Sequence, residues 1–382
     1  MNRSPKSTSL PIVGQNKGHH SSYQNWNMSA GSQFNHDSWQ DFMKSAVRSR
    51  AVLVKELELN AKIPGEIANL LPPAPLAGPT SLPTSIPAIE RSERDFPVFV
   101  TRPFLARIEK GNWNDPLLKQ VLPLADEQDI VPGYSQDPLA EINATKSPGL
   151  LHKYHGRALI VANSVCAINC RYCFRRHFPY HQVSQARQHR QALLEEIGRD
   201  PTISEVILSG GDPLLMVDSL LADWFQGLES IPHVRRIRIH TRLPIMIPGR
   251  VTPEFLDLIN KTRLSTVFVI HSNHAGELDH EVAAALNEVG RAGAFLLNQS
   301  VLLAGVNDDL KTLTDLSERL IECRVLPYYL HKNDPITGTA HFEVSIERGI
   351  ELINQMRAVL PGYAVPRFAQ EIAGETNKRV LA

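Results

Sequence analysis

Three of the four cysteines in the chain lie within eight residues of each other. Cys166, Cys170 and Cys173 form a C-x3-C-x2-C pattern, whereas Cys323 lies far away. Three thiolates on so short a segment can bind three irons of a four-iron cluster and leave the fourth iron open to a small molecule. A structural zinc normally needs four ligands, and His177 could supply the fourth. The pattern therefore favours a cluster, with a zinc site and unliganded buried thiols as alternatives.

Two further groups of residues follow the cysteines. The Gly210-Gly211-Asp212 turn ends a candidate strand, where glycines let the backbone approach a ligand that a side chain would block. Taken alone, it is also an ordinary turn. Arg175 and Arg176 come directly after the last cysteine of the pattern, and isolated arginines are usually solvated surface groups or phosphate contacts.

The elements that must position these residues alternate between strand and helix from about residue 155. Candidate strands, rich in β-branched residues, span 157–163, 205–210, 235–241, 265–272, 294–303 and 324–331. Candidate helices span 184–199, 217–230, 252–262, 279–293 and 310–323. This alternation predicts parallel βαβ units, and six repeats favour a barrel or a three-quarter barrel over an open sheet. In a barrel, the loops after the strands build the active site, and the cysteines and the glycine turn occupy such loops.

The first 150 residues have a different character. Residues 1–37 are rich in Ser, Asn, Gln, Gly and His, which predicts a disordered tail. Residues 38–150 form a helical and Pro-rich region: one or two short helices over 38–60, an extended Pro-rich stretch, and helices on either side of a GNWNDP turn at 111–116. Residues 151–382 form the barrel and its C-terminal segment.

Composition excludes several classes of protein. The 382 residues are 42% hydrophobic and 21% charged, which argues against a disordered or collagen-like chain. Lys and Arg (40) balance Asp and Glu (40), so nucleic-acid binding through a globally basic surface is disfavoured. There is no apolar stretch long enough for a membrane helix and no apolar core of a secretory signal at the start. We expect a cytoplasmic protein that binds neither nucleic acid nor membranes.

The CAINCRYCF segment resembles the signature of radical S-adenosylmethionine (SAM) enzymes. Together with LSGGDPLL, NQSVLLAGVND, LPYYLH and VPRFAQEIAGETNK, it resembles the lysine 2,3-aminomutase family from about residue 95 to the end. The segments LLHKYHGRALIV, CRYCFRRHFPY and QEIAGETNK are most similar to the bacterial members that make β-lysine for modification of elongation factor P. The resemblance implies an α/β fold, a partial (β/α)6 TIM-type barrel, and conversion of L-α-lysine to β-lysine, the R enantiomer in the elongation factor P pathway.

The resemblance also implies cofactors and the residues that hold them. A 4Fe-4S cluster would be bound by Cys166, Cys170 and Cys173. SAM would be received by the turn formed by Gly210, Gly211 and Asp212. Pyridoxal 5'-phosphate (PLP) would be held covalently by Lys378, the catalytic lysine, which requires the tail to pack into the barrel. Arg157 would contact the phosphate of PLP. Read without the family, Lys378 and Arg157 are surface charges.

Three residues would bind the substrate L-lysine in the same family comparison. Arg175 would clamp its carboxylate, since a guanidinium matches a carboxylate bidentately. Asp308 and Glu371 would hold its distal ammonium, although the family has Asp at the second position and a run of glycines of which only Gly374 is retained. Taken alone, both carboxylates are turn residues.

The implied partners are an external electron donor and, functionally, elongation factor P with its lysyl ligase. The alternatives are a mutase acting on lysine already attached to elongation factor P, a radical SAM modifying enzyme without PLP, and a zinc-stabilised interaction module.

Overall fold

The computed structural model describes residues 38–59, 87–180 and 189–382. The chain divides into two units, Met1–His36 and Asp37–Ala382, and every described element belongs to the second. The expected disordered tail over 1–37 and the greater part of the Pro-rich stretch, 60–86, lie outside the described residues.

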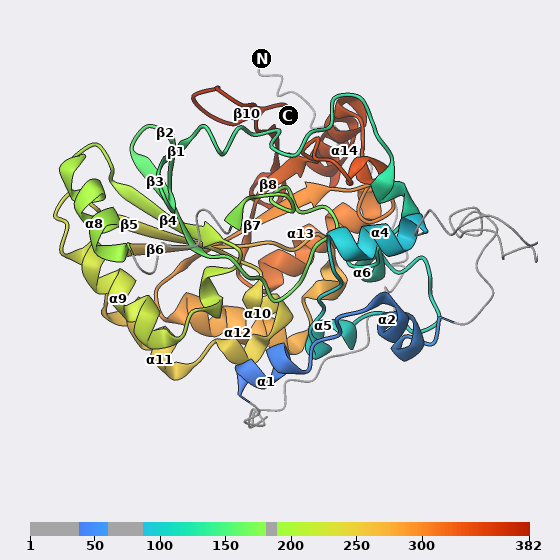
Figure 1. Ribbon diagram of the computed structural model, residues 1–382, viewed down its shortest axis with the longest axis horizontal. Coiled ribbons are helices and arrows are strands. Elements are labelled where there is room, and N and C mark those ends of the chain that lie inside the picture. Colours follow the sequence, from blue (N-terminus) through green and yellow to red (C-terminus); the bar gives the residue numbers. More distant parts are fainter. Residues whose placement is uncertain (1–37, 60–86, 181–188) are drawn as a thin grey trace, which may run out of the picture. The chain divides into compact units, whose positions relative to one another are not determined.

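A single curved sheet forms the centre of the second unit, and its ten strands are paired in the order of the sequence (Figure 1). The strands from β3 to β9 run parallel, while β1, β2 and β10 add antiparallel edges. The strands are β1 (Thr145–Ser147), β2 (Leu150–Tyr154), β3 (Arg157–Asn163), β4 (Glu205–Gly210), β5 (Arg236–Thr241), β6 (Ser265–Ile270), β7 (Phe295–Leu302), β8 (Leu326–Lys332), β9 (Arg367–Gln370) and β10 (Arg379–Val380). The six strands expected from the sequence are confirmed, each within two residues at either end.

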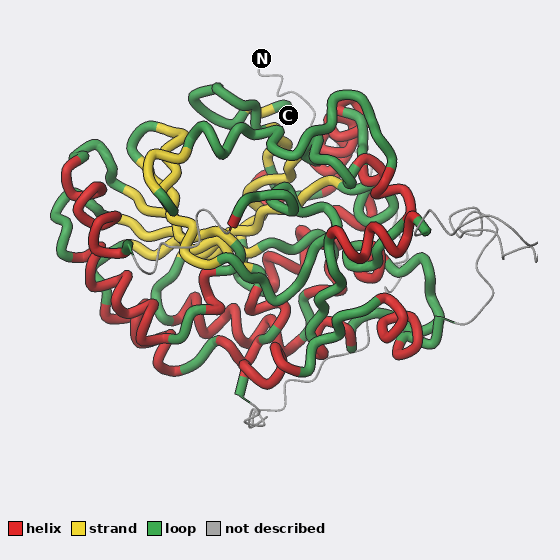
Figure 2. The backbone as a smooth tube through the Cα atoms, viewed as in Figure 1, coloured by secondary structure: helices red, strands yellow, loops and turns green. Residues whose placement is uncertain are grey.

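Helices cover the outer side of this sheet (Figure 2). They are α8 (Arg190–Arg199), α9 (Asp218–Glu229), α11 (Pro253–Lys261), α12 (His280–Arg291), α13 (Leu310–Glu322) and α14 (Ile346–Val359). Four of these helices begin at a side-chain cap, formed by Thr252, Asp279, Asp309 or Ser345; Asp279, for example, accepts from the backbone N–H of Val282 at 2.9 Å. The first five helices are confirmed over their described residues.

Helix α14 and strand β9 are not among the elements expected from the sequence. The four residues of β9 are too few to show a periodicity, and the strand is recognisable only from its pairing with β8. Gly349 of α14 faces Phe368 of β9, and a Cβ at this glycine would lie 2.3 Å from the Phe368 ring. The glycine therefore allows the helix to approach the strand closely.

The helices before the sheet are short. They are α1 (Trp39–Lys44), α2 (Arg50–Glu56), α4 (Ala88–Asp95), α5 (Arg102–Leu105) and α6 (Pro116–Lys119). The expected helices at 38–60 and on either side of the GNWNDP turn are thus confirmed, although α5 and α6 have only four residues each. Their apolar side chains, including Leu53, Phe104 and Leu118, belong to the same buried cluster as those of the strands β3 to β6.

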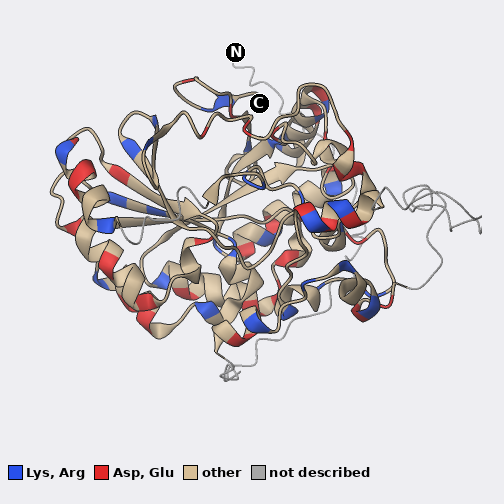
Figure 3. Ribbon diagram, viewed as in Figure 1, with Lys and Arg blue, Asp and Glu red and all other residues tan. Residues whose placement is uncertain are grey.

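Charges of both signs alternate along the outer helices in the view of Figure 3. Among the described helices, none is both long and apolar enough to cross a membrane.

Candidate active site

One cavity of about 500 Å³ brings together every predicted site residue except Asp308. The cysteines and the glycine turn line one part of it, and Arg157, Glu371 and Lys378 line another. Side chains at the ends of the middle strands complete the wall: His240, His271, Gln299, Tyr329, His331 and Asp334. Its volume is in the range of enzyme and cofactor pockets.

The loop that carries the cysteines is held by the segment before the sheet. The backbone N–H of Asn169 donates to the Phe99 carbonyl at 3.0 Å. Arg171, fully buried, forms an ion pair with Glu127, and Arg176 reaches the same carboxylate at 2.7 Å. A buried carboxylate shared by two guanidinium groups fixes the loop on both sides of Cys173.

The three thiols are free and line the same cavity. Burial, together with the other cysteines, raises the pKa of Cys173 to about 11 and that of Cys166 well above its usual value. Among the described side chains, no group of three or more His, Cys, Asp or Glu is arranged to hold a single metal ion. A four-iron cluster presents a separate iron to each thiol, so its ligands need not meet at one point. The donor set therefore fits such a cluster.

His177, the candidate fourth ligand for zinc, lies elsewhere. Its Nε2 is 3.0 Å from the Thr337 carbonyl oxygen, and its side chain lines a neighbouring pocket. The structure therefore does not bring it to the cysteines.

The glycine turn packs its backbone directly against the start of the cysteine loop. Gly210 has a φ of +118°, and a Cβ there would lie 2.3 Å from the Asn163 carbonyl oxygen. A Cβ on Gly211 would lie 2.3 Å from the carbonyl oxygen of Val165. Only glycine permits this approach, which leaves the backbone of the turn facing the cavity.

Asp212 is buried and is held by protein donors. One carboxylate oxygen accepts from the Thr241 hydroxyl at 2.7 Å and the Leu214 N–H at 3.0 Å, and the other accepts from the Arg242 N–H at 2.8 Å. Burial raises its pKa, against the effect of these hydrogen bonds. The carboxylate thus braces the ends of β4 and β5.

A chain of alternating charges crosses the cavity. Lys378 pairs with Glu371 at 3.1 Å, Glu371 with Lys153 at 2.8 Å, Lys153 with Glu141 at 3.2 Å, and Glu141 with Arg175 at 2.6 Å. Burial alone would raise the pKa of Glu371, but Lys378 and Lys153 outweigh it and lower the pKa to about 2. Two of the three predicted substrate-binding side chains, Arg175 and Glu371, therefore already carry counter-ions from the chain itself.

The C-terminal segment reaches the cavity because β10 pairs with β9. The Phe368 N–H donates to the Ala382 carbonyl at 3.0 Å, and the Leu381 N–H donates to Phe368 at 2.8 Å. Lys378 is 24% exposed, and its ammonium lies 5.8 Å from the centre of the Tyr329 ring. The C-terminal segment thus lies against the sheet, with Lys378 in the wall of the cavity.

The lysine end of the cavity holds several unpartnered polar atoms. The Nε atom of Arg157 and the Nε2 atoms of His240 and His331 are buried and have no hydrogen-bond partner among the described residues. Burial lowers the pKa values of both histidines well below their usual value, so they are neutral. A guanidinium and neutral imidazoles in the wall of the cavity fit a phosphorylated, hydrogen-bonding cofactor such as PLP.

Asp308 lies at the turn after β7 and is not brought to Glu371. Its carboxylate accepts from the Gly305 N–H at 2.9 Å, and its backbone carbonyl lies 3.4 Å from Arg348. The expected pair of carboxylates at the distal ammonium is therefore not formed by these two residues here, because Asp308 is used to close its own turn.

Asp334 is a cavity residue that the sequence analysis missed. It follows β8 and lines the cavity, and no described residue donates a hydrogen bond to its carboxylate. Burial and the neighbouring Glu371 raise its pKa from 3.8 to about 7. Its position directly after a parallel strand was the signal that could have identified it.

Comparisons with known proteins agree with this site. Residues 155–229 match a family model described as a 4Fe-4S single cluster domain. The chain is 47% identical over 287 residues to the L-lysine 2,3-aminomutases of Escherichia coli and Haemophilus influenzae, covering 75% of this chain and 83% and 85% of theirs. A radical SAM methyltransferase structure from Sphaerobacter thermophilus is 20% identical with a TM-score of 0.37, covering 58% of this chain and 68% of that one.

The matched 4Fe-4S model and the relatives identify a radical SAM enzyme, a class that uses a 4Fe-4S cluster and SAM. Within that class, the chain belongs to the L-lysine 2,3-aminomutase family, whose members are isomerases.

Proposed function

We propose that the chain is a PLP-dependent lysine 2,3-aminomutase that converts L-α-lysine to (R)-β-lysine. The observation that carries the proposal is the single cavity with three free thiols at one end and Lys378 with Glu371 at the other. When bound, the reduced cluster and SAM supply a hydrogen-abstracting radical, and PLP supplies a carbonyl group for the amino group of the substrate.

At the thiol end, Cys166, Cys170 and Cys173 would hold the cluster. Gly210 and Gly211 line the same space, and we expect the methionine part of SAM to lie against this turn. Within the protein, the Gly210 carbonyl accepts from the Tyr180 hydroxyl at 2.8 Å and the Gly211 N–H donates to the Asn163 carbonyl at 2.6 Å. Asp212 would support this turn rather than contact SAM itself, because its carboxylate oxygens already accept from the Thr241 hydroxyl and the Arg242 N–H. An external donor would supply the electron.

At the lysine end, Lys378 would bind PLP through its amine. Arg157 would meet the phosphate, since its Nε has no other partner and its guanidinium stacks on Tyr154 at 4.8 Å. Engaging the amine of Lys378 removes one of the two cations on Glu371. The carboxylate is then available to a substrate cation.

The substrate would lie between these ends. Glu371 and Asp334 are the carboxylates that the cavity offers to the distal ammonium, and Arg175 is the cation it offers to the carboxylate of lysine. Arg175 is held in place by Glu141 and by the Ser209 hydroxyl at 3.0 Å, and its side chain lines the cavity. Opposite charges at two ends select a long, doubly charged amino acid.

The parallel strands β3 to β8 and their outer helices are interpreted as the partial (β/α)6 barrel, with residues 38–150 as a helical and Pro-rich region and 151–382 as the barrel with its C-terminal segment. Such an enclosure keeps water and stray C–H bonds away from a reactive carbon radical. A cytoplasmic location is part of the same proposal, as expected from the sequence.

The biological destination of the product is proposed as elongation factor P, through its lysyl ligase. The support is the similarity of LLHKYHGRALIV, CRYCFRRHFPY and QEIAGETNK to the branch that serves this modification. A mutase that acts on lysine already attached to elongation factor P is the second candidate. A radical SAM enzyme without PLP would leave Lys378 without a task.

The test is anaerobic reconstitution with iron and sulfide, followed by incubation with L-lysine, SAM, PLP and a strong reductant. We expect β-lysine from the wild type and none from Lys378→Ala. A wild type that cleaves SAM but forms no β-lysine would contradict the free-lysine function. The next assay would then use lysine attached to elongation factor P.

A further inference from the structure

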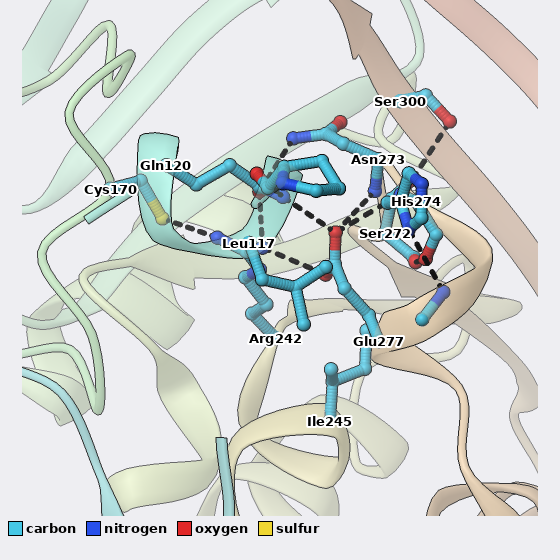
Figure 4. A network of polar contacts seen from close by, with 12 residues as sticks. Leu117, Gln120, Cys170, Arg242, Ile245, Ser272, Asn273, His274, Glu277 and Ser300 are labelled. Carbon is cyan, nitrogen blue, oxygen red and sulfur yellow. Dashed lines mark hydrogen bonds and ion pairs between the residues drawn. The ribbon is translucent and has the colours of Figure 1, made fainter. Parts of the chain in front are cut away.

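Arg242 lies between a cysteine sulfur and a buried carboxylate (Figure 4). It follows β5 directly, and its side chain is 7% exposed. One terminal nitrogen donates to the Cys170 Sγ at 2.8 Å, and the other donates to the Gln120 Oε1 at 2.7 Å and to the Glu277 Oε2 at 2.8 Å. The guanidinium is therefore fixed against a sulfur by two anchors on its far side.

The carboxylate of Glu277 is itself fixed in place by hydrogen bonds from three other residues. It is fully buried, and its Oε1 accepts from the backbone N–H groups of Asn273 at 2.9 Å and His274 at 3.1 Å, and from the Gln120 amide at 3.1 Å. Three donors on one oxygen offset part of the carboxylate charge. The backbone at Asn273 and His274, in the loop after β6, thus holds this carboxylate.

The backbone of Arg242 reaches the glycine turn. Its N–H donates to the Asp212 Oδ2 at 2.8 Å, while its side chain touches Cys170. One residue therefore links the turn expected to receive SAM with a thiol expected to bind the cluster. This double contact fixes the guanidinium relative to both.

We propose that Arg242 is a positioning residue that raises the reduction potential of the cluster by placing a buried cation on the Cys170 sulfur. The inference rests on the proposed role of Cys170 as a cluster ligand. Reduction adds an electron to a centre that is already anionic, and a cation at hydrogen-bond distance from a ligand sulfur stabilises the reduced state more than the oxidised one. Hydrogen bonds to sulfur and nearby charge are the protein's established means of adjusting such potentials.

The experiment is an EPR-monitored redox titration of the reconstituted enzyme without substrate, with iron and sulfide counted for each variant. Arg242→Met removes the cation and should lower the equilibrium constant for cluster reduction at least tenfold, about 59 mV for one electron. Glu277→Gln keeps the shape but removes the anion and should shift the potential in the opposite direction. Arg242→Lys keeps the charge and should restore part of the wild-type value.

Arg107→Met is the matched control. Arg107 is also a buried arginine, with a side chain 6% exposed, and it pairs with Asp279 at 2.6 Å away from the cysteines. Its loss should leave the potential unchanged. A general loosening of the fold would shift the Arg107 and Arg242 variants alike, whereas the proposed electrostatic role shifts only the latter.

The outcomes separate the inference from the proposed function. A wild type that binds no cluster would overturn the proposed function, and the inference with it. A wild type with a full cluster and an Arg242→Met variant of equal potential would overturn the inference alone. If Arg242→Met fails to retain a cluster, Glu277→Gln decides: a raised potential supports the role of this cation, and an unchanged or lowered potential contradicts it.

Discussion

The two ends of the cavity are built in different ways. The thiol end comes from compact segments, the cysteine loop and the glycine turn, and is held by backbone hydrogen bonds and by the buried carboxylates of Glu127, Asp212 and Glu277. The lysine end is assembled from β2, β9 and the C-terminal segment, and is held by ion pairs between side chains. The first end can keep its geometry without a ligand, whereas the second has counter-ions that a charged ligand can replace.

This difference has a mechanistic meaning. A cluster and SAM require a fixed frame because electron transfer and bond cleavage depend on constant distances. A substrate that enters and leaves requires charges that can exchange partners at low net cost. The chain Lys378–Glu371–Lys153–Glu141–Arg175 keeps each charge paired while the substrate is absent, which avoids the penalty of an isolated buried ion.

Loss of one cysteine of the loop is expected to have the largest effect. Cys173→Ala should abolish both SAM cleavage and β-lysine formation, a loss larger than the roughly 10–100-fold that removal of an outer-sphere partner costs in metal sites. Cys323→Ala is the control, because Cys323 is fully buried at the end of α13 and far from the cavity. The measurement is 5'-deoxyadenosine and β-lysine by mass spectrometry. Activity retained by the Cys173 variant would contradict the assignment.

Loss of Lys378 should impair the function of the lysine end while leaving that of the thiol end intact. Lys378→Ala should retain the cluster and reductive SAM cleavage but form β-lysine at a rate lower by several orders of magnitude, as for loss of a covalent catalytic group. Lys332→Ala removes a lysine of β8 that pairs with Glu343 at 2.5 Å and does not line the cavity. This control should behave as the wild type. Equal mutase rates in both variants would show that the lysine end is not where the substrate reacts.

The buried carboxylates of the two ends can be compared by stability. Glu127→Gln leaves the guanidinium groups of Arg171 and Arg176 without their anion and should lower the free energy of unfolding by about 3–5 kcal/mol. Glu141→Gln should cost less, because Lys153 keeps its contact with Glu371.

Urea denaturation of the apoprotein measures both changes. Asp257→Asn breaks an exposed pair with Lys261 and should cost no more than about 1 kcal/mol. A Glu141 variant less stable than the Glu127 variant would show that the charge chain, not the cysteine loop, is the more rigid end.

The smallest expected effect concerns Asp334. Because its pKa rises from 3.8 to about 7 on folding, the folded state binds its proton more tightly, and wild-type stability falls as the pH rises through this interval. The full shift corresponds to about 4 kcal/mol, and exposure to the cavity screens part of it. Asp334→Asn should therefore be more stable than the wild type by about 2 kcal/mol at pH 8.

The same variant should show no such gain at pH 4, where the aspartate is protonated in the folded state. Unfolding curves at the two pH values decide the matter. A variant equally stable or less stable than the wild type at pH 8 would mean that the Asp334 carboxylate is better solvated than its surroundings imply.

The sequence was most informative where structure is local. The β-branched runs that became β3 to β8 are each continuous in the sequence, and the cysteine spacing lies within eight residues. The carboxyl ends of these strands were correctly expected to face one site. Strand β9 was missed because its four residues are too few to show a periodicity. Helix α14 was missed although Leu352, Ile353 and Met356 recur at helical spacing on its buried face.

The partners of the site residues could not be predicted. Nothing in the sequence pairs Arg175 with Glu141, or Arg242 with Cys170, because these contacts join segments 34 and 72 residues apart. For the same reason Asp308 was expected beside Glu371, whereas in the structure the Asp308 carboxylate accepts a hydrogen bond from the Gly305 N–H within its own turn. Motifs identify residue types, but the charges that surround them depend on the fold.

In the proposed function, the thiol end and the lysine end of the cavity act on the same lysine molecule. The most direct measurement uses L-lysine carrying deuterium at carbon 3, incubated with the reconstituted enzyme, SAM, PLP and reductant, followed by mass spectrometry of 5'-deoxyadenosine. We expect deuterium in the 5'-deoxyadenosine, because the radical formed from SAM at the thiol end must take hydrogen from the lysine held at the other end. Deuterium-free 5'-deoxyadenosine formed in the presence of labelled lysine would contradict it.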